Sequence, residues 1–176
     1  MRRQLKQPSP PERSATVASR MAFRKHPLHP MLVVYPVAFL SAVFATDVLY
    51  LASGLPFWAQ CAYWLNVAGL GLGLMAGVVG ALDMFLIPVA RRHVSAWNHF
   101  LAAVMVLALA ALGVWWRSRD PVAAVWPWGL LQSALLLAMV FVAGWLGGTL
   151  SFRHGIGVYG EVESAESRAD DTPPAQ

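Results

Sequence analysis

The five histidines are the residues of this chain best suited to chemistry. Neutral imidazole is the commonest side-chain ligand of metal ions, and it is also an axial ligand of haem iron. His29, His99 and His154 each lie close to the end of a long apolar segment, and each belongs to a different segment. Asp83 lies near the end of the remaining segment. A carboxylate there is costly to bury and marks a functional site by default, so we expect these four residues to form a ligand site.

Haem b is the cofactor that we expect first at this site. His99 and His154 open and close consecutive segments, so we expect them to face one another as its ligands, with His29 as an alternative or additional ligand. A single transition-metal ion held by His29, His99, His154 and Asp83 is the alternative to haem. Asp83 could instead accept a hydrogen bond from an imidazole or pair with Arg91–Arg92, and we favour these two roles over direct ligation.

A structural role for the histidines is the competing interpretation. It predicts that they bond the backbone or lipid headgroups, as we expect in any case for His26 and His93. The protein would then be a non-redox membrane scaffold, or a carrier of a small solute or metal ion. A carrier usually has polar or broken helices at the membrane midplane, whereas the centres of these segments carry mostly Gly, Ala, Leu and Val. No serine or cysteine lies in a recognisable nucleophile motif, so the sequence gives little support to a hydrolase, and a redox role would be that of an electron-transfer component.

Four helices that cross a membrane must position these residues. Apolar residues make up 57% of the chain and charged residues 12%, and nearly all the charges lie outside four apolar segments. About 20 apolar residues in a helix span the hydrocarbon core of a bilayer. The sequence therefore predicts an all-α protein, a bundle of four transmembrane helices within the lipid bilayer. The expected spans are 31–52, 58–87, 97–116 and 126–150.

The chain divides into a membrane domain over residues 25–158, a basic tail over 1–24 and an acidic tail over 159–176. Both tails have compositions typical of disorder. With four spans, 11 of the 13 lysines and arginines lie on the side of the tails, and only Arg117 and Arg119 lie on the other. The positive-inside rule then places both termini in the cytoplasm. The net charge of +4 reflects this topology and is not a sign of nucleic-acid binding.

Glycines at helical spacing form stripes that predict close helix packing. The stripes can serve the bundle itself or a homodimer. The segments form two helix hairpins without a convincing internal repeat. The glycines are Gly69, Gly73, Gly77 and Gly80 in the second span and Gly144 and Gly147 in the fourth.

Two further polar residues lie inside the apolar segments. Asp47 has no basic partner nearby in the sequence, so we expect it to be a hydrogen-bonded packing residue or to lie at the membrane interface. Cys61 is the only cysteine, which excludes an internal disulfide and a thiolate zinc site. We expect it to act as a small apolar residue.

No apolar signal region precedes the first span, so we expect no cleaved signal peptide.

Short motifs at the segment ends resemble a bacterial family of predicted membrane proteins, the domain of unknown function 2231. They are His26-Pro-Leu-His29-Pro30, Gly80-Ala-Leu-Asp83, His99, Gly147-Gly148 and His154-Gly155-Ile-Gly157-Val158. The resemblance extends from about Lys25 to Val158 and implies a four-helix inner-membrane protein. Some members resemble membrane partners of Rieske-type iron–sulfur domains, which implies electron transfer. This chain has no Rieske cysteine–histidine pairs, so an iron–sulfur or other redox partner would be a separate protein.

Overall fold

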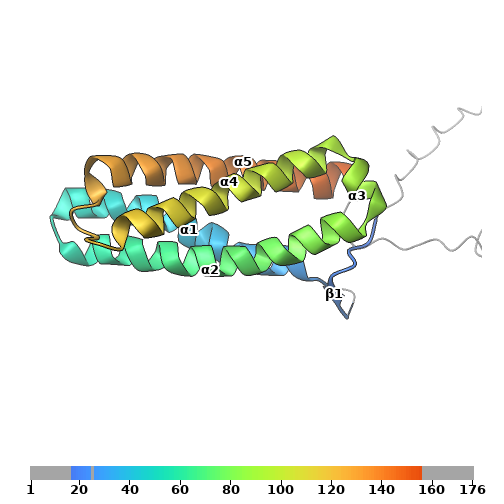
Figure 1. Ribbon diagram of the computed structural model, residues 1–176, viewed down its shortest axis with the longest axis horizontal. Coiled ribbons are helices and arrows are strands. Elements are labelled where there is room, and N and C mark those ends of the chain that lie inside the picture. Colours follow the sequence, from blue (N-terminus) through green and yellow to red (C-terminus); the bar gives the residue numbers. More distant parts are fainter. Residues whose placement is uncertain (1–16, 25, 156–176) are drawn as a thin grey trace, which may run out of the picture.

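The computed structural model describes residues 17–24 and 26–155 and consists of a bundle of long antiparallel helices (Figure 1). A short helix and a π-helical turn connect them, and a two-residue strand pair precedes the first. In chain order the elements are β1 Ala22–Phe23, β2 His26–Pro27, α1 Leu28–Ser53, α2 Pro56–Leu86, α3 Pro88–Arg92, α4 Val94–Arg117, the turn η1 Val125–Gly129 and α5 Leu130–His154.

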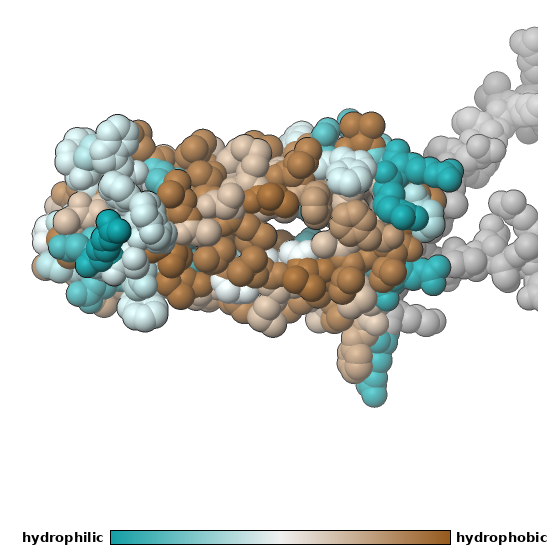
Figure 2. Space-filling model, in the orientation of Figure 1, coloured by the Kyte–Doolittle hydropathy of each residue, from teal (hydrophilic) through white to brown (hydrophobic). Residues whose placement is uncertain are grey.

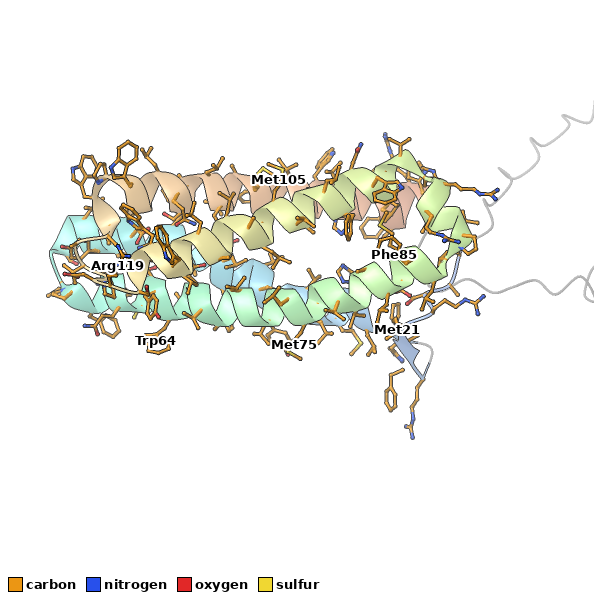
Figure 3. All side chains as sticks on the ribbon, viewed as in Figure 1. Met21, Trp64, Met75, Phe85, Met105 and Arg119 are labelled. Atoms are coloured by element: carbon orange, nitrogen blue, oxygen red, sulfur yellow. The ribbon has the colours of Figure 1, made fainter. Side chains whose placement is uncertain are left out.

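The four long helices are each long and apolar enough to cross a membrane, with mean hydropathy of 1.9 to 2.0. The face that Figure 2 shows is mostly apolar along the middle of the helices, where brown and tan residues predominate. Met75 on α2 and Met105 on α4 point away from the bundle (Figure 3), and both are more than half exposed. Lipid rather than water must cover such a surface. The expected fold of four membrane-spanning helices is confirmed.

Proline and glycine set the helix boundaries. Pro56 and Pro88 occupy the first positions of α2 and α3, where the missing N–H costs least. Gly54 and Gly155 follow α1 and α5 in the left-handed conformation, with φ of 68° and 61°. The helix ends therefore follow from local backbone chemistry.

The bundle has two chemically different ends. The histidine end carries the first turns of α1 and α4 and the last turns of α2 and α5. The ion-pair end carries the opposite helix termini, together with η1. Both ends of the described chain lie at the histidine end, where the Val17 N–H donates a hydrogen bond to the Gly155 carbonyl at 2.9 Å.

Residues 17–24 are ordered, which corrects the prediction of a disordered tail for this part of residues 1–24. β1 pairs with β2 in antiparallel register, so the chain turns back before α1 begins. Val17 packs against the small apolar cluster of Ile87 and Ala90. Residues 1–16 and 156–176, which include the predicted acidic tail, lie outside the described residues.

A buried ion pair joins α1 to α4 at the ion-pair end. Both side chains are fully buried, and the contact is bidentate, with Arg117 Nη1 and Nη2 lying 2.8 and 2.6 Å from the two carboxylate oxygens of Asp47. Ser133 Oγ donates a further hydrogen bond to Asp47 at 2.7 Å, and Arg117 Nη2 also donates to the Gly129 carbonyl at 3.1 Å. Asp47 thus has a basic partner that its sequence neighbourhood did not reveal, and Arg117 is not a loop charge.

The two hairpins, α1–α2 and α4–α5, bury equivalent positions. In the first helix of each hairpin the matching buried residues lie seventy positions apart, and in the second helix they lie sixty-seven apart. The spacing of these buried positions therefore recurs between the two hairpins, and we call this correspondence the internal repeat. The first set pairs Pro36, Leu40, Val43 and Asp47 with Val106, Ala110, Gly113 and Arg117. The second pairs Ala62, Asn66, Gly69 and Gly73 with Gly129, Ser133, Leu136 and Val140.

The first helices of the two hairpins occupy opposite corners of the bundle. α1 packs against α2 and α5, while α4 packs against α5 and α2. A core of Leu40, Val106, Ala110, Leu136 and Val140 fills the centre. Residues at equivalent positions of α1 and α4 therefore face each other across the bundle axis.

We predict that removing one member of the ion pair destabilises the bundle much more than removing both. Arg117→Leu leaves a buried carboxylate without its partner and should lower the free energy of unfolding by about 3–5 kcal/mol. The double variant Asp47→Leu/Arg117→Leu should recover most of this loss. Unfolding by sodium dodecyl sulfate in mixed micelles measures the difference.

Arg119 provides the matched control, because it is an exposed arginine two positions further along whose guanidinium lies 5.5 Å from the centre of the Trp115 ring. Arg119→Leu should change the free energy of unfolding by no more than about 1 kcal/mol. Equal effects of Arg117→Leu and Arg119→Leu would contradict the assignment.

Candidate functional site

Two histidines from opposite corners of the bundle lie side by side within the histidine end. His29 is the second residue of α1, and His99 lies in the second turn of α4. Their ring centres are 6.2 Å apart and their planes are inclined by 80°. Both side chains are half-buried. They occupy equivalent positions in the two hairpins, so the internal repeat accounts for the pair.

A backbone hydrogen bond orients each ring. His29 Nδ1–H donates to the Ala76 carbonyl of α2 at 2.8 Å, and His99 Nδ1–H donates to the Ala143 carbonyl of α5 at 3.0 Å. A carbonyl can only accept, so both imidazoles carry their proton on Nδ1 when they are neutral. Each Nε2 then presents a lone pair, and neither has a hydrogen-bond partner among the described residues. This arrangement is typical of a histidine that binds a metal.

Glycines make room for both rings. A Cβ atom at Gly80 would lie 2.7 Å from His29 Nδ1, and one at Gly147 would lie 3.0 Å from His99 Cε1. Each glycine lies one helical turn after the carbonyl that its histidine contacts. The motif Ala-x-x-x-Gly therefore occurs twice, as Ala76–Gly80 and Ala143–Gly147, and each copy contacts one imidazole. This motif was the sequence signal that could have paired His29 with His99.

The other predicted packing glycines divide into two groups. Gly69 faces the side chain of Leu40, and Gly73 and Gly77 both face Leu107 of α4. Gly144 is exposed, and a Cβ there would have no neighbour within 4 Å. The glycines that touch neighbouring helices therefore serve the bundle itself, and Gly144 does not.

His154 belongs to a second pair. Its ring centre lies 4.1 Å from that of His93, and its Nε2 is 3.4 Å from Ser95 Oγ. The ring contacts of the described residues therefore join His154 with His93 and His99 with His29. His29, expected as the alternative ligand, takes the place beside His99 that we expected His154 to fill.

Asp83 anchors the segment that precedes α1. It accepts hydrogen bonds from Ser19 Oγ at 2.5 Å and from the N–H groups of Arg20 and Met21 at 2.8 and 2.9 Å. Met21 and Phe85 mark this region at the histidine end in Figure 3. We expected Asp83 to accept a hydrogen bond from an imidazole or to pair with Arg91–Arg92. Both expectations are wrong, because its partners among the described residues are Ser19, Arg20 and Met21.

A site for a bare metal ion does not form from the expected residues. Within residues 17–24 and 26–155, no group of three or more His, Cys, Asp or Glu side chains is placed to hold an ion. The four expected metal ligands lie in three separate places. His29 and His99 form one imidazole pair, His154 pairs with His93, and Asp83 binds backbone N–H groups. What remains as a candidate ligand site is the pair of His29 and His99.

The bundle defines a multi-pass membrane protein, in which four apolar helices enclose a polar pair at each end. Residues 25–160 match the family described as Predicted membrane protein (DUF2231). The match extends over most of the chain, so the chain belongs to this family, as its motifs predicted. No curated protein and no solved structure matches it.

We predict that alanine is harmful only at the two glycines that face a histidine. Gly80→Ala and Gly147→Ala must displace an imidazole from its carbonyl and should lower the free energy of unfolding by about 1–3 kcal/mol. Unfolding in mixed micelles, with the chemical shift of the affected imidazole nitrogen, measures the effect.

Gly71 and Gly144 are matched controls in the same two helices, because a Cβ at either position has no neighbour within 4 Å. Gly71→Ala and Gly144→Ala should be neutral, or stabilising by up to about 1 kcal/mol because alanine favours the helix. If all four variants behave alike, the glycines do not hold the histidines.

Proposed function

We propose that His29 and His99 bind a b-type haem as its two axial ligands, and that this protein is an electron-transfer component of the bacterial inner membrane. One observation carries the proposal. Two half-buried imidazoles from helices at opposite corners lie 6.2 Å apart, each hydrogen-bonded through Nδ1 to a helix carbonyl. Such hydrogen bonds orient a ligand histidine and leave Nε2 for iron.

The number of available ligands favours haem over a bare ion. A structural or catalytic metal ion takes at least three protein ligands, whereas haem brings its own four nitrogens and needs only axial partners from the protein. His29 and His99 would hold the group through their Nε2 atoms.

Apolar helices surround the pair, because His29 packs against Gly80 of α2 and His99 packs against Gly147 of α5. Figure 2 shows a hollow in the apolar face between α2 and α4. An apolar wall raises the cost of net charge on the iron and so tunes its potential. In this proposal the bundle supplies ligands, orientation and a low dielectric constant, and the haem supplies the one-electron chemistry.

The proposed orientation places the histidine end at the cytoplasm. Arg119 is the only exposed lysine or arginine at the ion-pair end among the described residues, because Arg117 is buried against Asp47. The remaining 11 basic residues precede α1, connect α2 to α4, or lie in or after the last turn of α5. This asymmetry supports cytoplasmic termini. A separate iron–sulfur or other redox protein would exchange electrons at that side, since no histidine lies at the opposite end to hold a second haem.

The alternative function is a non-redox membrane scaffold, and a specific observation favours it. Both imidazoles fit against glycines and bond the backbone of the neighbouring helix, which by itself holds helices together. A single transition-metal ion, with ligands completed by water or a partner, is a further occupant of the same pair. One experiment separates these three cases.

We predict that the purified protein, loaded with haem in detergent, shows a Soret band and sharp α and β bands after reduction with dithionite. His29→Ala and His99→Ala should each abolish the low-spin spectrum, because each removes one axial ligand. His154→Ala is the matched control and should leave the spectrum unchanged, since His154 lies with His93.

Two outcomes would reject haem. A colourless protein with stoichiometric zinc, copper or iron that is lost in the His29 and His99 variants would retain the site for a metal ion. A protein that takes up neither haem nor metal would establish the scaffold.

We predict that reporters fused to residue 176 report a cytoplasmic terminus. Green fluorescent protein there should fluoresce and alkaline phosphatase should be inactive, because phosphatase folds only after export. A phosphatase inserted after Arg119 should be active. The reverse pattern would invert the proposed topology.

A further inference from the structure

The ion-pair end contains a second concentration of buried polar groups, independent of the histidines. We call it the buried polar cluster, and it consists of Asp47, Arg117, Ser133, Asn66 and Gln132. Asp47, Asn66, Arg117 and Ser133 are fully buried, and Gln132 is half-buried. Asp47 and Ser133 are satisfied by the ion pair and its hydrogen bonds. The other three residues are not.

Four buried polar atoms of the cluster have no hydrogen-bond partner among the described residues. They are Asn66 Nδ2, Asn66 Oδ1, Gln132 Oε1 and Arg117 Nε. Gln132 Nε2 donates a hydrogen bond to the Leu109 carbonyl at 2.8 Å, and Gln132 Oε1 has no partner among the described residues. An unpaired polar group buried in an apolar surrounding costs about 1–3 kcal/mol, so four in one place require a partner.

The unpaired groups converge on one glycine. A Cβ atom at Gly113 would collide with Asn66 Nδ2, and it would lie 2.7 and 2.9 Å from Gln132 Nε2 and Oε1. Gly113 of α4 lies one turn before Arg117, so the amides from α2 and α5 meet one helical turn from the arginine. The internal repeat supports the placement of Asn66 near Arg117. Asn66 occupies the position in α2 that is equivalent to Ser133 in α5, and Ser133 contacts Asp47, the other member of the ion pair.

We propose that Asn66, Gln132 and Arg117 bind one or two water molecules inside the membrane domain. The unpaired atoms include N–H donors on Asn66 and Arg117 and carbonyl acceptors on Asn66 and Gln132. Water donates and accepts at once, and a buried water typically makes about three hydrogen bonds. An anion does not fit this site, because Asp47 already neutralises the charge of Arg117. A cation does not fit either, because the N–H donors of Asn66 and Arg117 would repel it.

The site lies near enough to the surface for water to enter. Arg117 is the last residue of α4, and Gln132 is the third residue of α5. The apolar core of Leu40, Val106 and Ala110 separates the site from the histidine pair. The bound water therefore hydrates the ion pair and does not form a path across the bundle, and its presence does not depend on haem.

The test uses the full-length protein in lipid nanodiscs with uniform ¹⁵N labelling. Proton NMR spectra selective for water should show cross-peaks between the side-chain NH₂ of Asn66 and a water molecule of long residence. Asn66→Leu assigns the signal by removing it. Gln132→Met keeps the side-chain length but removes Oε1, and it should weaken the Asn66 cross-peak while the protein stays folded.

Asn98 provides the matched control, because it is an exposed asparagine on α4. Asn98→Leu should leave the Asn66 cross-peak unchanged. A resolved Asn66 amide without a water cross-peak in the wild-type protein would overturn the proposal. An Asn66 signal of full intensity in Gln132→Met would also overturn it, since the two amides would then not share the water. Gln132→Met keeps the test decisive if Asn66→Leu does not fold.

Discussion

The contact between Asp47 and Arg117 is the constraint on which the bundle depends. Two charges at zero exposure within an apolar domain are tolerable only together, because either alone would leave an uncompensated charge in a medium of low dielectric constant. Their bidentate geometry fixes both the rotation and the axial position of α4 relative to α1. Each charged residue follows its histidine by eighteen positions, five turns of α-helix on the same face. Alignment of the charges therefore also aligns His29 with His99.

The internal repeat gives the polar pairs their common origin. Equivalent positions of two hairpins meet across the bundle axis, so one end of the repeat produces an imidazole facing an imidazole. The other end pairs an acid with a base, which attract each other. Such complementarity favours pairing between the two hairpins over pairing of either hairpin with a copy of itself. Gly80 and Gly147 are needed at their positions, because a Cβ atom at either one would collide with the imidazole of His29 or His99.

Membrane solvation explains how four helices can carry so few specific contacts. Apolar side chains gain little from leaving lipid, so close packing and a few polar contacts must hold helices together. Here the contacts lie near the two ends, with an apolar core between them. Asp83 adds a further attachment by holding residues 19–21 over the histidine end. Four of the five buried side-chain polar atoms that lack a hydrogen-bond partner among the described residues belong to the ion-pair end, and the fifth is His93 Nδ1.

The sequence by itself determined the four helices, their approximate ends and the family. These follow from local chemistry, since a bilayer requires about twenty apolar residues per span and proline and glycine end helices. Only the tertiary structure decided that His99 lies beside His29, that His154 lies beside His93 and that Asp47 binds Arg117. These partners are 61 to 70 residues apart, and the rotation of each helix about its own axis selects them. A run of leucine, alanine and glycine does not specify that rotation, because nearly every face of such a helix is equally apolar.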